Sequence, residues 1–303
     1  MPSDPRQWRV GLVGYGEVGR ILAEDLRAQG LSVSAYDVKL GSADDTPIRE
    51  HAGRFGVPLT ANHAALTSEA DFIVSAVTAS QAVAVAEACA PAIRQEAFFL
   101  DFNSASPGAK IKAAAHIDAR GGRYVEGAVM TAITQYRIRV PLLLGGSSAA
   151  VLQPLAVAIG FDAKVASEQL GVASATKMCR SVMIKGLEAM VIESFTAARA
   201  YGVEDQVLAS LAETFPGIDW EKQGGYFFRR AIQHGRRRAE EMREAATTVR
   251  ERGLEPWSSA GTAERHAWMG NLAEAGAFGP RAAASPGWRV DADRILAALK
   301  AGT

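Results

Sequence analysis

Side chains that can carry or transfer a proton stand at helical spacing in the middle of the chain. Lys177, Ser181 and Lys185 follow one another at steps of four residues, and Arg180 lies one turn from Lys177. An amine beside a reacting hydroxyl can take its proton as a general base. Burial and neighbouring cations both lower the pKa of a lysine toward a useful range, so we expect this for Lys177. Spacing alone leaves a second interpretation open, in which these cations point to solvent.

The residues around these cations indicate one long helix. Apolar side chains recur at helical spacing between Gly171 and Gly202, and no proline falls between Pro154 and Pro216. At about 1.5 Å per residue, a helix over 174–200 spans roughly 40 Å, more than one small domain needs. We therefore expect an interdomain helix that ends near Gly202.

A glycine turn near the N-terminus predicts a dinucleotide site. Gly14, Gly16 and Gly19 follow an apolar run at 9–13 and precede a helical pattern. In this context the glycines allow a tight turn, close approach of a pyrophosphate, and packing of helix on strand. The helix start, with Glu17 and Val18, then presents free N–H groups to the phosphates. The alternative is a glycine turn that serves only the fold.

Asp37 favours one of the two common dinucleotides. It follows Gly19 by 18 residues, directly after a predicted strand at 33–36. A carboxylate at this position accepts hydrogen bonds from the ribose hydroxyls and repels a 2′-phosphate, which favours NAD. Lys39 could reach a 2′-phosphate, so NADP stays open as the cofactor.

Strands and helices alternate over the first half of the chain. The pattern predicts strands at 58–60, 72–77, 98–101, 124–129 and 140–144, and helices at 47–54, 80–93, 107–119 and 149–159. Such alternation is typical of an α/β fold with a doubly wound, mostly parallel sheet. Ligands bind at the carboxyl ends of the strands in these sheets. The residues expected on that rim are Val77, Thr78, Asn103, Ser104, Met130 and Thr131.

The last third of the sequence predicts an all-α domain. Candidate helices cover 203–214, 226–233, 236–252, 262–276 and 290–299. We expect residues 1–168 to form a Rossmann-like NAD(P)-binding domain. Residues 169–303 would form the interdomain helix and an α-helical substrate and dimerisation domain. His234 lies between two of the predicted helices, where it could contact substrate or only cap a helix.

Charge and composition exclude several classes of function. The 303 residues contain 33 Lys and Arg and 33 Asp and Glu, so nothing global attracts nucleic acid or an anionic membrane. The run Arg236-Arg237-Arg238 is followed by Glu240 and Glu241, which favours an exposed, ion-paired helix. Two cysteines without metal-ligand spacing predict neither a disulfide framework nor a metal site.

The sequence also predicts where the protein is located and how it assembles. No basic-then-apolar leader and no membrane-length apolar run are present, so we expect a cytoplasmic protein with no membrane partner. The C-terminal third contains more aromatic residues than a small helical domain needs for its own core. We therefore expect a symmetric homodimer whose C-terminal helices pack against the partner. The aromatic residues in question are Phe195, Phe215, Trp220, Tyr226, Phe227, Phe228, Trp257 and Trp268.

Three segments occur in the order and approximate spacing of a known family. They are the glycine turn at 14–19, the segment from Asp101 to Pro107, and the segment from Gly171 to Ser181. The second is similar to an Asp-x-Ser-Thr-x-x-Pro motif, and the third to a Gly-x-Gly-x-x-x-Lys-x-x-Asn-Asn motif. Over nearly its whole length the chain resembles the β-hydroxyacid dehydrogenase superfamily, relatives of 6-phosphogluconate and 3-hydroxyisobutyrate dehydrogenases. The resemblance implies that Lys177 is the catalytic lysine.

The sequence departs from the family pattern where substrate is bound. Met130, Thr131 and Ala132 stand where the family has a Ser-Gly-Gly loop. Arg180 and Ser181 replace its paired asparagines, and Glu240 stands near the place of a common lysine. The resemblance is therefore to a branch with altered substrate contacts and a distinct C-terminal domain.

Together these patterns predict an NAD(P)-dependent oxidoreductase that transfers a hydride between nicotinamide and a small anionic 3-hydroxy acid or sugar acid. Lys177 would be the general acid and base. An imine reductase on the same scaffold and a non-catalytic NAD-binding regulator are the alternatives. The expected substrate contacts are Ser104, Met130, Thr131, Arg180, Ser181, Lys185 and His234.

Overall fold

The structure, a computed structural model, describes residues 2–279 and 287–301. The chain divides into two compact units, Met1–Met178 and Cys179–Thr303. The predicted boundary at residues 168 and 169 precedes the long helix, whereas the two units divide within it, after Met178.

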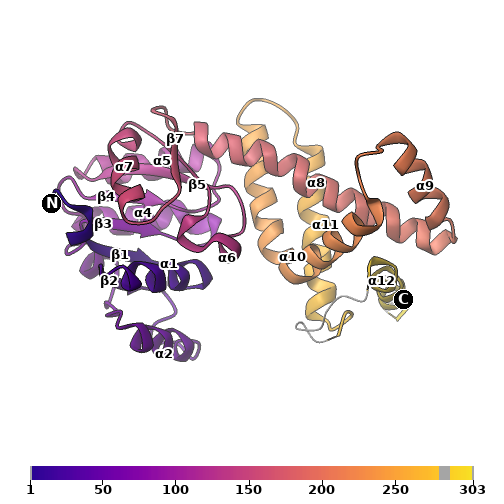
Figure 1. Cartoon of the computed structure of the whole chain (residues 1–303), viewed down its shortest axis with the longest axis horizontal. Coiled ribbons are helices and arrows are strands. Elements are labelled where there is room, and N and C mark those ends of the chain that lie inside the picture. The colour runs from indigo at the N-terminus through magenta and orange to yellow at the C-terminus, as the bar shows by residue number, and fades with distance from the viewer. Residues whose placement is uncertain (1, 280–286, 302–303) are drawn as a thin grey trace. The chain divides into compact units, whose positions relative to one another are not determined.

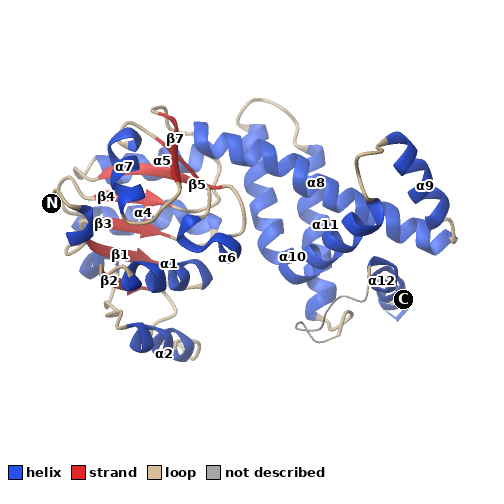
Figure 2. Ribbon diagram, in the orientation of Figure 1, coloured by secondary structure: helices blue, strands red, loops and turns tan. Residues whose placement is uncertain are grey.

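The first unit is built on a single sheet of seven strands (Figures 1 and 2). Their order is β2-β1-β3-β4-β5-β6-β7, and β6 is antiparallel to β5 while the other neighbours are parallel. The predicted mostly parallel α/β sheet is confirmed. The strands are β1 (Arg9–Val13), β2 (Ser32–Tyr36), β3 (Phe72–Ser75), β4 (Phe98–Asp101), β5 (Arg123–Val129), β6 (Leu142–Gly145) and β7 (Ala163–Ser167).

The sheet is doubly wound because its central strands are apolar on both faces. In β3, Phe72 and Val74 belong to one apolar core and Ile73 belongs to the other. Two separate cores form because successive side chains of a strand point to opposite faces. The helices of this unit are α1 (Glu17–Ala28), α2 (Thr46–Phe55), α3 (His63–Thr67), α4 (Ala82–Cys89), α5 (Pro107–Asp118), α6 (Ile133–Tyr136) and α7 (Ala149–Ala158).

Different helices cover the two faces of the sheet. One core contains Leu22 of α1 and Leu152 of α7, and the other contains Leu66 of α3, Val85 of α4 and Ile117 of α5. The loops that contain the predicted rim residues follow the carboxyl ends of β3, β4 and β5, which the helices on the two faces leave uncovered.

Some predicted elements of this unit differ from the observed ones. The segment 58–60 forms one bridge, between Ala35 and Leu59, and no strand. The predicted helix at 80–93 is α4 with short 3-10 turns on either side. Strand β7 was not predicted, because the three residues in its middle are exposed and give no apolar alternation.

The long helix is confirmed as α8 (Val172–Tyr201), and the described residues of the second unit form helices and loops with no strand (Figure 2). Its apolar core includes Phe195 of α8, Phe228 of α10 and Trp288 of α12. The remaining helices are α9 (Glu204–Thr214), α10 (Trp220–Arg250), α11 (Trp257–Glu274) and α12 (Trp288–Ala301).

Helix α10 replaces two helices that the sequence predicted. The backbone leaves helical geometry only at His234, with φ −132° and ψ 15°, and the helix resumes at once. Gly235 follows the kink, and a Cβ there would lie 2.6 Å from the carbonyl oxygen of His266 and 2.7 Å from the Gly270 nitrogen. The glycine thus serves the close approach of α10 and α11 rather than the end of a helix.

Candidate functional site

The glycine turn has the geometry that a dinucleotide site needs. Gly14 has φ +90°, and a Cβ on it would lie 2.4 Å from the Ala76 carbonyl oxygen. A Cβ on Gly19 would lie 2.1 Å from the Gly14 carbonyl oxygen, so helix α1 can approach the strand only with glycine there. Gly16 faces open space and is exposed, as a residue approached by a pyrophosphate must be. Glu17 and Val18 begin α1 beside it.

Asp37 is held at the end of β2 by the backbone of the turn. Its carboxylate accepts hydrogen bonds from the Tyr15 N–H at 2.8 Å and the Lys39 N–H at 2.9 Å. The side chain is half-buried, so part of the carboxylate remains accessible. This position, next to the glycine turn, fits the expected recognition of a ribose.

Asn103 joins the ends of two neighbouring strands. Its side-chain oxygen accepts a hydrogen bond from the Val77 N–H at 2.6 Å, and its amide donates to Ser75 Oγ at 3.1 Å. Val77 also lies against Gly14, because a Cβ on Gly14 would be 2.9 Å from a Val77 methyl carbon. The structure therefore brings these predicted cofactor residues together, with Thr78 exposed beside them.

A buried ion pair lies beneath this rim. Lys110 Nζ is 2.9 Å from Asp101 Oδ1, and each residue is 1% exposed. The Tyr124 hydroxyl donates to Asp101 Oδ2 at 2.7 Å, and the Asn103 N–H donates to Asp101 Oδ1 at 2.9 Å. Burial and the Asp101 carboxylate raise the pKa of Tyr124 well above its usual value. The network fixes the turn after β4 that carries Asn103 and Ser104.

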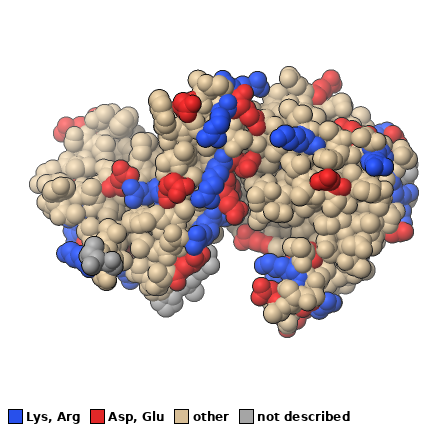
Figure 3. Space-filling view, turned by 180° about the vertical axis from the view of Figure 1, so that it is seen from behind, with Lys and Arg blue, Asp and Glu red and all other residues tan. Residues whose placement is uncertain are grey.

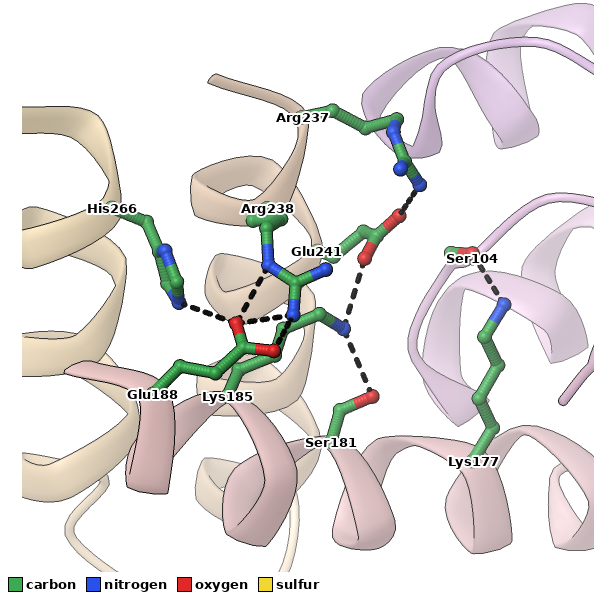
Figure 4. Close-up of polar contacts among 9 residues, drawn as sticks. All are labelled: Ser104, Lys177, Ser181, Lys185, Glu188, Arg237, Arg238, Glu241 and His266. Carbon is green, nitrogen blue, oxygen red and sulfur yellow. Dashed lines mark hydrogen bonds and ion pairs between the residues drawn. The ribbon is translucent and has the colours of Figure 1, made fainter. Parts of the chain in front are cut away.

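Lys177 reaches this same turn. Its Nζ donates a hydrogen bond to Ser104 Oγ at 2.5 Å, and its side chain is half-buried. Figure 4 shows this contact. The amine is thus beside the loop that follows β4, where Asn103 also lies. The remaining rim residues lie on the loop after β5, where the Met130 N–H donates to the Pro141 carbonyl oxygen at 2.9 Å and Thr131 is exposed.

The second unit contains a cluster of charged side chains around Lys185. Lys185 is 8% exposed, and its Nζ lies 2.9 Å from Glu241 Oε2 and 3.1 Å from Ser181 Oγ (Figure 4). Arg237 pairs with the same Glu241 carboxylate at 2.7 Å. Lys185 therefore already has an anionic partner within its own unit, which spacing could not show.

A buried pair continues this cluster. Arg238 and Glu188 form a bidentate ion pair, with Nε 2.8 Å from Glu188 Oε2. Arg238 is 5% exposed, so the expectation of a wholly exposed arginine run is wrong at this residue. Arg236 and Arg237 are exposed and ion-paired as expected. Burial raises the pKa of Glu188 despite the neighbouring guanidinium.

Two further predicted substrate residues belong to the second unit. Arg180 is exposed on α8, and His234 is half-buried at the kink of α10. The geometry within each unit does not by itself assign a ligand to either residue.

Among the described residues there is no group of three or more His, Cys, Asp and Glu side chains placed to hold a metal ion. Acidic and basic side chains lie side by side on the face drawn in Figure 3. Surface ion pairs such as Arg199–Asp293 join residues of opposite charge. Within the described parts of the chain, every helix is too short or too polar to span a bilayer.

Two family models match the chain. The NAD binding domain of 6-phosphogluconate dehydrogenase matches residues 9–157, and the domain of unknown function DUF1932 matches residues 198–269. The first match covers the glycine turn, Asp37 and Asn103, and the second covers most of α9 to α11.

Solved structures are similar over nearly the whole chain. A conserved hypothetical protein from Sinorhizobium meliloti is 34% identical, with a TM-score of 0.76 over 95% of this chain and 96% of that one. A conserved protein of unknown function, reported as structurally similar to 3-hydroxyacid dehydrogenases, is 28% identical, with a TM-score of 0.68 over 88% and 98%. A 3-hydroxyisobutyrate dehydrogenase from Mycobacterium tuberculosis, solved with L-serine, shares the fold at 15% identity and a TM-score of 0.71 over 95% and 99%.

Proposed function

Because the chain belongs to the β-hydroxyacid dehydrogenase superfamily, in a branch with a distinct C-terminal domain, we propose a specific reaction for it. The protein is an NAD(P)-dependent oxidoreductase that transfers a hydride between nicotinamide and a small anionic 3-hydroxy acid or sugar acid. The observation that carries this proposal is the Lys177 amine, 2.5 Å from Ser104 Oγ on the rim of the dinucleotide-binding sheet.

The residues of the first unit fit the dinucleotide. Gly16 and the start of α1 offer backbone N–H groups and open space to the phosphates, and Asp37 offers a fixed carboxylate to the ribose. Val77 and Asn103 stand at the strand ends where the nicotinamide would lie. When bound, the dinucleotide supplies the acceptor or donor of the hydride.

Lys177 handles the proton of the reaction. In the oxidising direction its neutral amine takes the proton of the substrate hydroxyl, and in the reducing direction its ammonium returns it. Ser104 holds the Lys177 Nζ and can hydrogen-bond the substrate as well. The buried Asp101–Lys110 pair keeps the loop that carries Ser104 in place.

The second unit would bind the anionic part of the substrate. Arg180, Ser181, Lys185 and His234 remain the proposed contacts, with Met130 and Thr131 from the first unit. Because Lys185 is paired with Glu241, a substrate carboxylate would have to share or replace that partner. This requirement favours substrates whose carboxylate can compete with the half-buried Glu241 carboxylate for the Lys185 ammonium.

A substrate panel tests the proposal. The protein is mixed with 3-hydroxy acids and sugar acids together with NAD or NADP, and in parallel with imines together with NADH or NADPH. The absorbance of the reduced nicotinamide is followed in both sets. At least one acid is expected to support turnover. Turnover confined to imines would establish the imine reductase instead, and cofactor binding without turnover on acids or imines would favour a regulator.

A further inference from the structure

A buried carboxylate contacts the first turn of α8. Glu126 lies in the middle of β5 and is 0% exposed. Its Oε1 accepts hydrogen bonds from the Gly171 N–H at 2.9 Å and the Ala173 N–H at 3.0 Å. Its Oε2 accepts one from Ser174 Oγ at 2.8 Å. All three donors come from the start of the helix that carries Lys177.

Glu126 is anchored by the helix rather than by a cation. Within residues 2–279 and 287–301, no ion pair joins Glu126 to a lysine, arginine or histidine. A buried carboxylate without such a pair is costly unless hydrogen bonds stabilise it. The free N–H groups and the dipole at a helix N-terminus supply that stabilisation. In return, Glu126 satisfies N–H groups that the helix itself leaves unpaired.

The neighbouring strand leaves room for this contact. Gly145 of β6 is the register partner of Glu126, and a Cβ on Gly145 would lie 2.2 Å from Glu126 Oε1. Any larger residue at Gly145 would displace the carboxylate from the helix. The contact therefore depends on two adjacent strands as well as on α8.

The turn that Glu126 holds is the one before Lys177. Ser174 precedes Lys177 by three residues, so the two side chains lie about one helical turn apart on the same side of α8. A fixed first turn sets the rotation of the helix about its axis. That rotation determines whether Lys177 Nζ meets Ser104 Oγ.

We propose that Glu126 is a positioning residue for Lys177: by capping the start of α8, it holds the amine beside Ser104. The inference rests on the proposed function, in which Lys177 transfers the proton. Glu126 acts on the orientation of α8 and has no contact with the reacting atoms.

Two substitutions at Glu126 test whether its hydrogen bonds to the start of α8 position Lys177. Glu126→Gln keeps the size and one carbonyl oxygen for the Gly171 and Ala173 N–H groups. Its amide can donate to Ser174 Oγ, whose own proton can go to the Gly171 carbonyl oxygen 3.1 Å away. Glu126→Ala removes all three bonds. We expect Glu126→Gln to keep kcat within about threefold, and Glu126→Ala to lower it by roughly 10- to 100-fold, the effect of a misplaced reacting group. The dissociation constant for NAD should not change.

A second readout does not depend on finding the substrate. The reaction of Lys177 with an amine-acylating reagent can be followed by peptide mass spectrometry, with the exposed Lys39 and Lys164 as internal references. We expect Lys177 to react several-fold faster in Glu126→Ala, since its amine is no longer held at Ser104. The rates of the reference lysines, and of Lys177 in Glu126→Gln, should match wild type.

Asp118→Ala is the matched control. Asp118 also accepts a backbone hydrogen bond at β5, from the Tyr124 N–H at 3.0 Å, but it has no bond to α8. The Asp118→Ala protein should be less stable than wild type, but its kcat and the rate of Lys177 labelling should not change. If Glu126→Ala does not fold, Ser174→Ala, which removes one of the three bonds, should show the same changes to a smaller degree.

The outcomes that overturn the inference are distinct from those that overturn the proposed function. Folded Glu126→Ala and Ser174→Ala proteins with wild-type kcat and wild-type Lys177 labelling would refute the positioning role. Equal loss of kcat in Glu126→Gln and Glu126→Ala would also refute positioning by hydrogen bonds. If Lys177→Ala keeps full kcat, the proposed function fails, and the labelling rates still decide whether Glu126 orients Lys177.

Discussion

We expect Asp37 to discriminate between the dinucleotides by its charge. Its carboxylate is fixed by the N–H groups of Tyr15 and Lys39, so it cannot swing away from a ligand without losing both bonds. We predict at least about tenfold tighter binding of NAD than of NADP, or about 1.4 kcal/mol. Fluorescence titration with each reduced cofactor measures the ratio. Equal or tighter binding of NADPH would show that Lys39 outweighs Asp37.

His266 makes the stability of the protein depend on pH. It is 0% exposed, and its Nε2 lies 3.7 Å from Glu188 Oε2. Burial and the Arg238 guanidinium lower the pKa of His266 from 6.5 to about 3. Below pH 6.5 the unfolded chain binds a proton that the folded chain does not, so stability falls as the pH falls toward about 3.

The expected size of this effect follows from linkage. Between pH 7.5 and pH 5.5, His266 should remove about 1.4 kcal/mol from the free energy of unfolding. Urea unfolding of wild type and His266→Leu at both pH values isolates the contribution of the imidazole. Identical pH dependence in the two proteins would mean that His266 titrates normally in the folded state.

Residues in a continuous motif could be predicted from the sequence, and residues in a buried network could not. The glycine turn, Asp37 and Lys177 stand in recognisable local patterns. Glu126 has its partners 45 to 48 residues away, and no local signal marks it. The sequence likewise does not indicate Lys110. A separation of nine residues from Asp101 fits no local pattern, and the two side chains meet only because α5 packs against β4.

At the level of elements, the contact between α10 and α11 depends on glycine. Gly235→Ala would place a Cβ 2.6 Å from a backbone oxygen of α11, which can be relieved only by moving a helix. We predict a loss of about 1–3 kcal/mol in the free energy of unfolding, the usual cost of overpacking.

Gly225→Ala in the same helix is the control. A Cβ on Gly225 meets no atom within 4 Å. Because alanine favours helix, this variant should be neutral or more stable by up to about 1 kcal/mol. Thermal unfolding of both variants makes the comparison, and equal Tm values for the two would contradict the packing role of Gly235.

Element type was predicted well where periodicity was strong and poorly where tertiary contacts decided. The 30 residues of α8 have a continuous helical pattern and form one helix. The pair His234-Gly235 predicted a break, yet α10 continues because packing on α11 compensates for the kink. The exposed strand β7 follows its parallel neighbour β6 rather than any pattern of its own.

At the scale of the whole molecule, we predict a symmetric homodimer, but the side chains that support this prediction differ from those that the sequence indicated. Phe195, Phe227 and Phe228 fill the core of the second unit, so these aromatics need no partner subunit. Large apolar side chains do remain exposed there, including Met190 at 62% and Trp257 at 80%. Contiguous exposed apolar patches are typical of interaction surfaces, so we expect these side chains to lie in the dimer interface.

Light scattering at micromolar protein gives the assembly state. We expect the mass of two chains for wild type and a shift toward one chain for Met190→Lys, which would place a charge in the interface. A wild-type protein with the mass of one chain would contradict the predicted dimer.

The most direct test of the central claim is the steady-state comparison of wild type with Lys177→Ala on the substrate that the panel identifies. Loss of a positioned acid and base should lower kcat by roughly 10²- to 10⁴-fold. The dissociation constant for NAD should stay near wild type, because the proposed cofactor contacts, the glycine turn and Asp37, do not depend on Lys177. A Lys177→Ala protein that folds, binds NAD and retains more than about a tenth of wild-type kcat would contradict the assignment of Lys177 as the proton-transfer group.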